Sequence, residues 1–361
     1  MGTIGRIFFI GWASLWCAGQ GLADTAFLAL RNAGAVVALD IDTGAIIERI
    51  PVGTLPRSTT ASADGKRVFV INEGDISVSI IDTTTLSLER TIDMRAVVRG
   101  GSSSSPIDVM GNIGAAPDGS AFYVAGQFMG ALRFDLRTDE IIGFGLGGSG
   151  EMYVMPGSMP EISTDGRRLY LMSHPNLLIL DAQTMKPAGR LPSTNGFSGT
   201  GSVFRVSPDG EIVISDDDFG RFTFGNLATF TSEQILIPMT GSGTDSRGMA
   251  FAPDGSRVYR SRGDGTIHII DIASRSVVMR SKEGISRAGI AVSPDGRLLV
   301  AMDPASNRVT ILDAASLEVL RVVEIAGNPT AYGQFIVTSP ATALDATVRP
   351  QRDERAPEIR F

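Results

Sequence analysis

The chain has very few thiol and imidazole groups. Among its 361 residues there is one cysteine, Cys17, and there are two histidines, His174 and His268. A single cysteine forms no intramolecular disulfide, and no Cys-x-x-Cys-His motif is present to attach a c-type haem. The histidines lie far apart at unlike positions, so we interpret both as surface or packing residues and expect no histidine-based metal site.

Positive charge and long hydrophobic runs are also scarce. The formal net charge is −7, with 32 Lys and Arg against 39 Asp and Glu. Nucleic-acid binding needs a basic stripe, so this charge balance argues against it. The apolar run from Ile7 to Cys17 is shorter than the roughly 20 residues of a membrane-spanning helix.

The first 23 residues have the pattern of a secretory signal peptide. Arg6 precedes the apolar run, and the small residues Gly21 and Ala23 stand at the −3 and −1 positions before Asp24. An N-terminal membrane anchor is the alternative. Cleavage would remove Cys17 and leave a thiol-free, periplasmic or secreted protein with no membrane span. We therefore predict a signal peptide at 1–23, one domain at 24–339 and a polar C-terminal tail at 340–361.

The chain is rich in an Asp-Gly turn signal that recurs at intervals of about 40–50 residues. Each copy stands between two short β-branched-rich runs, and two more such runs follow it. The six copies begin at Asp64, Asp118, Asp165, Asp209, Asp254 and Asp295. This period of four-strand units predicts a β-propeller.

A second landmark fixes the number of units at seven. A short polar residue ends the third strand of every unit, at Asp40, Asp82, Asp135, Asp181, Asn226, Asp271 and Asp313. We expect each to pin the turn to the fourth strand. The first unit lacks its own first strand, and a run at 332–337 matches a first strand with nothing after it. The sequence thus predicts an all-β, seven-bladed propeller of four-stranded antiparallel blades, closed by that C-terminal strand against the N-terminal three.

The second unit resembles the YVTN repeat. Phe69, Val70, Ile71 and Asn72 stand in the places of the Tyr-Val-Thr-Asn strand, between the Asp64-Gly65 turn and a run ending at Asp82. The segment from Gly327 to Ile336 is similar to the last repeat of exported members. The resemblance implies a propeller whose relatives include surface-layer proteins, periplasmic proteins and quinoprotein amine dehydrogenase subunits. It supplies no catalytic residues.

Arginines precede several of the first strands. They lie in the connections that lead from one blade to the first strand of the next. Arg57 and Arg247 share one register, seven residues before the aspartate of their units, and Arg287 is one residue further out. Guanidinium groups converging on a channel mouth could hold a small anionic ligand. Alternatively, they tie one blade to the next.

Two further charged residues have uncommon positions. Glu161, near the start of a first strand, is a candidate general base or an ion-pair partner for a channel arginine. Arg260 occupies an otherwise apolar or small strand position and must be paired, for which Asp264 and Glu283 are the nearest acidic candidates.

Two clusters resemble metal-ligand sets. Asp216, Asp217 and Asp218 could bind Ca²⁺, although the run reads as a solvated acidic turn. Met152, Met155 and Met159, with Met110, could bind Cu⁺, although methionine commonly fills loop packing. We therefore predict no cofactor.

Two functions fit these features. The first is a non-catalytic ligand-binding or protein-interaction scaffold, whose partner is a small anion or another exported protein. The second is an enzyme or enzyme subunit, either a lactonase-like hydrolase or a quinoprotein dehydrogenase partner, using the arginines with Glu161.

Overall fold

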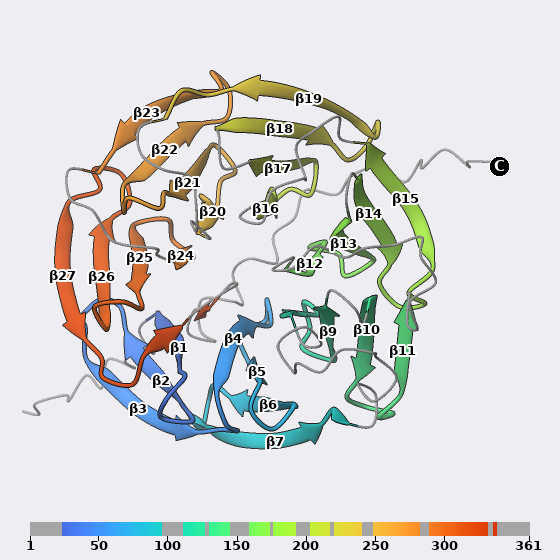
Figure 1. Cartoon of the computed structure of the whole chain (residues 1–361), viewed down its shortest axis with the longest axis vertical. Coiled ribbons are helices and arrows are strands. Elements are labelled where there is room, and N and C mark those ends of the chain that lie inside the picture. The colour runs from blue at the N-terminus through green and yellow to red at the C-terminus, as the bar shows by residue number, and fades with distance from the viewer. Residues whose placement is uncertain are drawn as a thin grey trace, which may run out of the picture.

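The fold is a ring of seven β-sheets (Figure 1). The computed structural model describes residues 24–95, 111–126, 130–144, 159–173, 176–192, 203–216, 220–239, 248–281, 289–330 and 335–337. Short runs rich in Val, Ile, Leu and Phe form the strands, and Asp-Gly and Asx turns separate them. The predicted all-β, seven-bladed, four-stranded antiparallel propeller is confirmed.

Each blade follows the chain from the axis outward. The first three blades comprise β1 (Thr25–Leu30), β2 (Ala35–Asp40) and β3 (Ile46–Pro51); β4 (Pro56–Ala61), β5 (Arg67–Asn72), β6 (Ser77–Asp82) and β7 (Ser87–Asp93); and β8 (Asn112–Ala115), β9 (Ala121–Gly126), β10 (Gly130–Asp135) and β11 (Ile141–Phe144). The fourth and fifth comprise β12 (Glu161–Ile162), β13 (Arg168–Ser173), β14 (Asn176–Asp181) and β15 (Pro187–Pro192); and β16 (Val203–Val206), β17 (Ile212–Asp216), β18 (Arg221–Asn226) and β19 (Thr231–Leu236). The sixth and seventh comprise β20 (Met249–Phe251), β21 (Arg257–Ser261), β22 (Ile267–Asp271) and β23 (Ser276–Arg280); and β24 (Gly289–Val292), β25 (Leu298–Asp303), β26 (Arg308–Asp313) and β27 (Val319–Glu324).

The hydrophobic core is divided among the junctions between blades. Each of seven clusters of buried apolar side chains joins two neighbouring blades. Between the second and third blades, for example, the rings of Phe122 and Phe134 stack with centroids 5.1 Å apart, and Phe69 lies 5.8 Å from Phe122. Each blade therefore buries its apolar faces only against its neighbours, as expected for a repeat array.

The seam lies where the last blade meets the first. Their buried side chains, among them Leu28 and Val300, form one cluster. Two short strands, β28 (Pro329–Thr330) and β29 (Ile336–Val337), pair antiparallel with β1, and the amide of Phe27 donates to the carbonyl of Phe335. Residues 331–334 lie outside the described residues, so the single closing strand at 332–337 stays a prediction.

The Asp-Gly turns share one hydrogen-bonding pattern. In four units a serine two residues before the aspartate donates its hydroxyl to the carboxylate at 2.5–2.6 Å and accepts an amide from the second strand. The other two units have alanine there, and a serine after the turn replaces the missing hydroxyl, Ser120 for Asp118 and Ser256 for Asp254. Gly65 and its counterparts take positive φ, which explains the glycine.

The polar residue that ends each third strand is structural, as predicted. The Asp313 carboxylate accepts the amides of Ala315 and Ser316, and Asn226 does the same through its side-chain oxygen. The residue four positions after this polar residue has a positive φ, for example 57° at Leu317, four positions after Asp313. The side chain thus holds a bulged turn that leads into the outer strand.

These turns predict a loss of stability in acid. The amide and hydroxyl of Ser316 hold the pKa of Asp313 below its usual value, and those of Thr184 act alike on Asp181. A carboxyl with a depressed folded-state pKa stabilises the fold above its unfolded pKa, near 4, and loses that effect as pH falls through the folded value. The free energy of unfolding in urea should fall between pH 5 and pH 3. Asp313→Asn, which imitates Asn226, should reduce that dependence, and an unchanged slope would contradict the assignment.

Within the part of the chain that the structure describes, no helix is both long and apolar enough to span a bilayer.

Candidate functional site

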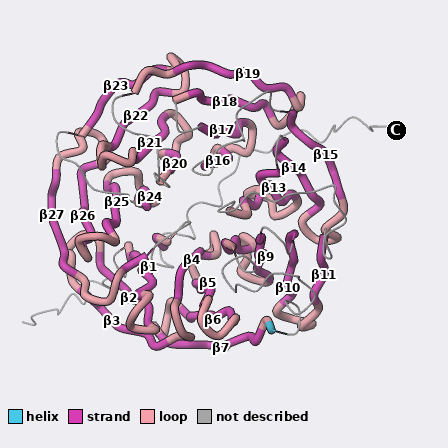
Figure 2. Tube along the Cα trace, viewed as in Figure 1, coloured by secondary structure: helices cyan, strands magenta, loops and turns pink. Residues whose placement is uncertain are grey.

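The topology defines two faces of the ring. The turns between second and third strands and the connections from one blade to the next lie on one face, here called the mouth face. The Asp-Gly turns lie on the opposite face. The innermost strands, including β4, β12, β16, β20 and β24, surround the axis, as Figure 2 shows.

In each of six blades, one residue of the first strand lies at the same number of positions before the Asp-Gly turn, and these six residues therefore lie at the same height. They are here called the inner ring. Its residues, each four positions before the aspartate, are Thr60, Gly114, Glu161, Arg205, Ala250 and Ala291. Two adjacent members are charged and the other four are small, so the ring is strongly asymmetric.

The two charged members form an ion pair. Nη1 of Arg205 lies 3.1 Å from Oε1 of Glu161 and donates to the carbonyl of Phe204 at 2.9 Å. Nη2 of Arg205 contacts the Met159 sulfur at 3.4 Å. Burial raises the pKa of Glu161, and the Arg205 guanidinium opposes that rise. Of the two roles weighed for Glu161, the ion-pair role is the one the structure shows, and Met159 lies beside a cation.

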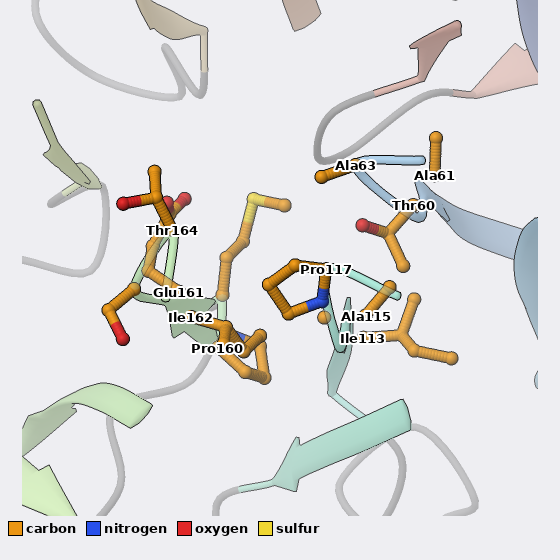
Figure 3. Close-up of a pocket in the computed structure, with 13 residues that line it drawn as sticks. Thr60, Ala61, Ala63, Ile113, Ala115, Pro117, Pro160, Glu161, Ile162 and Thr164 are labelled. Atoms are coloured by element: carbon orange, nitrogen blue, oxygen red, sulfur yellow. The ribbon is translucent and has the colours of Figure 1, made fainter. Parts of the chain in front are cut away.

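A cavity of about 120 Å³ extends from Glu161 between the first strands of three successive blades (Figure 3). Its wall is formed mostly by small and apolar residues, including Ala61, Ala115 and Ile162. Thr60 and Thr164 add hydroxyl groups to the wall. The cavity is wide enough for several water molecules or one small ligand.

Gly114 sets the width of this cavity, because any side chain there would meet the neighbouring blade. A Cβ atom would lie 2.5 Å from the carbonyl oxygen of Pro160 and 2.6 Å from Cδ1 of Ile162. We expect Gly114→Ala to lower the free energy of unfolding by about 1–3 kcal/mol, since backbone must move. Gly189→Ala is the matched control: its Cβ would approach nothing closer than 3.4 Å. Equal losses in the two variants, measured by urea unfolding, would contradict this tight approach.

Arg57 belongs to a cluster of three charges on the mouth face. Its Nη1 lies 2.5 Å from Oε1 of Glu73, and Nη1 of Arg31 lies 2.6 Å from the other carboxylate oxygen. Arg31 comes from the turn after β1 and Glu73 from the turn after β5, so the cluster joins the first two blades. Glu73 is only 2% exposed, whereas Arg31 is 26% and Arg57 16% exposed. Two partly exposed guanidiniums therefore share one buried carboxylate.

A second cluster lies where the fifth and sixth blades meet. Nε of Arg260 lies 2.8 Å from Oδ2 of Asp216, and both side chains are fully buried. Nη1 of Arg260 donates to the carbonyls of Gly248 and Ser261, and Nη1 of Arg262 lies 3.9 Å from the same Asp216 oxygen. Asp216 and Ser261 end their strands at the mouth face. Two guanidiniums again accompany one carboxylate.

The field of these arginines acts on His268 on β22. Burial, and then the charge of Arg262, lower the pKa of His268 to about 4. The imidazole is therefore neutral at neutral pH. Its exposure is 1%, so the interpretation of His268 as a packing residue is confirmed.

Two sequence-based expectations for the second cluster are wrong. Arg260 does not pair with Asp264, whose carboxylate instead accepts the amide and hydroxyl of Thr266. Asp216 is not part of a solvated acidic turn, because it is the fully buried last residue of β17. The reason is strand register: the ends of β17 and β21 meet across a blade junction, which proximity in sequence does not reveal.

Several candidate residues lie outside the described residues. They are Met110, Met152, Met155, His174, Asp217, Asp218, Arg247, Glu283 and Arg287. Among the described candidates, Arg57 and Glu161 are engaged by different partners. Among the described residues no group of three His, Cys, Asp or Glu side chains is arranged to hold a metal ion.

Arg31, Glu73 and Arg205 are not among the site residues predicted from the sequence. Arg205 could have been found, because it stands four residues before Asp209, as Glu161 stands before Asp165. Arg31 and Glu73 lie in turns after second strands, where charged residues are common, and no local signal distinguishes them.

Comparisons with known proteins match part of this chain to a family model and to a curated relative. Residues 230–343, which include β19 to β29, match the family model of the cytochrome D1 heme domain. The dihydro-heme d1 dehydrogenase of Pseudomonas aeruginosa is 29% identical over 143 residues, which are 39% of this chain. The chain matches only 26% of the length of that relative.

Two solved structures share the fold. Hydrazine synthase of Kuenenia stuttgartiensis superposes with a TM-score of 0.62 at 18% identity, covering 81% of this chain and 92% of that one. Dihydro-heme d1 dehydrogenase NirN in complex with DHE superposes with a TM-score of 0.60 at 15% identity, covering 90% of this chain and 76% of that one. Both identities are below 25%, so these two similarities show the propeller fold alone.

Proposed function

We propose that this propeller binds a carboxylate-bearing tetrapyrrole of the heme d1 type on its mouth face. The proposal is supported by the similarity to the cytochrome D1 heme domain and to a dihydro-heme d1 dehydrogenase. The observation that carries it is the position of Arg31 and Arg57, two partly exposed guanidiniums held side by side on that face by the buried Glu73.

The acid groups of the ligand would bind the Arg31 and Arg57 guanidiniums. Arginine binds carboxylates with two parallel hydrogen bonds, and such charge-assisted bonds strengthen where water is excluded. Arg31 and Arg57 are partly exposed and so are within reach of a ligand. Arg247 and Arg287, which precede the first strands of the sixth and seventh blades, complete the proposed set of ligand-binding arginines.

The described residues fit the acid groups of such a ligand better than they fit a metal at its centre. His268, the one described histidine, lies on the third strand of the sixth blade opposite Arg260, and its side chain is buried away from a ligand on the mouth face. Met159, a possible sulfur donor, contacts the Arg205 guanidinium. We therefore propose binding through the acid groups at the periphery of the macrocycle.

An absorbance titration with matched ligands tests the function. Purified protein would be titrated with heme d1 and with heme d1 whose carboxyl groups are methyl-esterified. Saturable binding of the free acid, weakened about 10- to 100-fold by esterification, is expected, because each charge-assisted contact contributes about 1.5–3 kcal/mol. Equal affinity for the two ligands, or no saturable binding of either, would refute the proposal.

We further propose that the chain is exported and cleaved after Ala23. The cut would create an α-ammonium group at Asp24. Burial, and then the charges of Asp295 and Asp42, raise the pKa of the Asp24 carboxyl to about 6, so a new positive charge there would relieve repulsion. Mass spectrometry of the periplasmic or secreted protein should find Asp24 at the N-terminus. A retained leader would exclude this processing.

A further inference from the structure

The cavity beside Glu161 extends toward the side of the ring opposite to the proposed ligand. The cavity below it is lined by Pro117 and Thr164, which belong to Asp-Gly turns on the opposite face, and by Met159 and Pro160 nearer the mouth. The Glu161 side chain is 11% exposed. The cavity therefore extends from Glu161 toward the opposite face, and Figure 3 shows Glu161, Thr164 and Pro117 among the residues that line it.

The Glu161 carboxyl has one charged neighbour among the described residues packed around it. Arg205 on β16 faces it at 3.1 Å. From β4 the residue at the same height is the neutral Thr60, from β8 it is Gly114, and β13 pairs Tyr170 with Glu161. Arg57, further along β4 toward the mouth, is engaged by Glu73. The pKa of the Glu161 carboxyl is thus set by one neighbouring cation, Arg205, and by partial burial.

We propose that Glu161 takes up a proton when an anionic ligand binds on the mouth face, and that this proton arrives through the cavity from the opposite face. The inference rests on the proposed function, because it requires a ligand of negative charge above the inner ring. Negative charge placed near a carboxylate disfavours its ionised form. The reaction is a simple protonation of Oε1 or Oε2 by solvent, with no other bond changed.

The sign of the coupling follows from linkage. A ligand that raises the pKa of Glu161 causes proton uptake between the free and the bound pKa. By reciprocity the ligand binds more tightly when Glu161 is already protonated, so affinity should increase as pH falls through this range. Burial already raises the pKa of Glu161 in the free protein above the ordinary value of a glutamate. The pH range of proton uptake therefore begins above that ordinary pKa.

Calorimetric titration with heme d1 in buffers of different ionisation enthalpy counts the protons exchanged on binding. The wild type should take up a measurable fraction of one proton per ligand, with a maximum at one pH. Glu161→Gln keeps an oxygen for Arg205 and should abolish this uptake while changing affinity by no more than a few-fold. Glu233→Gln, a change at an exposed carboxylate paired with Arg275 on the outer strands, is the matched control and should keep the uptake.

Three outcomes decide the inference. Loss of uptake in Glu161→Gln, with uptake kept in Glu233→Gln, supports it. Binding with the same uptake in Glu161→Gln as in the wild type overturns it and leaves the proposed function intact. No binding of heme d1 by the wild type overturns the function and the inference together. Should Glu161→Gln fail to fold, Glu161→Asp keeps a titratable carboxyl and should shift the pH of maximum uptake, and an unshifted maximum overturns the inference.

Discussion

Asp216→Asn should destabilise the protein by about 3–5 kcal/mol, the largest loss of stability that we expect from a single replacement. The carboxylate faces the fully buried Arg260 at 2.8 Å and Arg262 at 3.9 Å. Without it, two buried guanidiniums at the junction of the fifth and sixth blades lack this negative charge. Urea-induced unfolding, followed by circular dichroism, measures the loss.

Two further variants separate the buried pair from ion pairs in general. Asp93→Asn removes an exposed partner of Arg95, where the two side chains are 54% and 61% exposed, and should cost less than about 1 kcal/mol. Asp216→Asn combined with Arg260→Met should recover part of the loss, because a stranded guanidinium is replaced by an apolar side chain. A loss below about 1 kcal/mol for Asp216→Asn alone would contradict the inference that Asp216 and Arg260 form a buried ion pair on which the fold depends.

Neutralising the first mouth-face cluster should weaken binding of heme d1 by about 10- to 100-fold. The triple variant Arg31→Gln, Arg57→Gln and Glu73→Gln removes two positive charges and one negative charge together, so no buried carboxylate is left unpaired. Loss of one charge-assisted contact to a ligand acid group corresponds to about 1.5–3 kcal/mol, which gives this range. The dissociation constant from absorbance titration is the measurement.

Arg297→Gln is the control for this variant. It removes an exposed arginine from an Asp-Gly turn on the opposite face, near Asp295 and Asp42, and should leave the affinity unchanged. The triple variant should unfold at a urea concentration close to that of the wild type. Unchanged affinity in a folded triple variant would remove Arg31 and Arg57 from the ligand site.

The fold could be predicted from sequence because its signals are local and repeated. Each Asp-Gly turn combines a left-handed glycine with a carboxylate that accepts nearby amides and a serine hydroxyl, as at Ser293 and Asp295. Asp313 and its counterparts mark the third strand by similar short-range bonds. Such bonds need no knowledge of the tertiary structure, and their count therefore gave the correct number of blades.

The ion pairs could not be predicted in this way because their partners come from different blades. Asp216 and Arg260 are 44 residues apart, as are Glu161 and Arg205, and they meet only once neighbouring strands are aligned. Proximity in sequence suggested Asp264 for Arg260, which is wrong. Comparing equivalent positions between units would have placed Glu161 and Arg205 at one height, although not their contact.

A crystal structure of the protein with heme d1 bound tests the central claim most directly. The account predicts that the macrocycle lies on the mouth face with at least one acid group on Arg31 or Arg57, and that Glu161 lies between the ligand and the cavity lined by Pro117 and Thr164. A macrocycle bound elsewhere, such as in the groove between Phe224 and Arg275 at the outer strands, would contradict it.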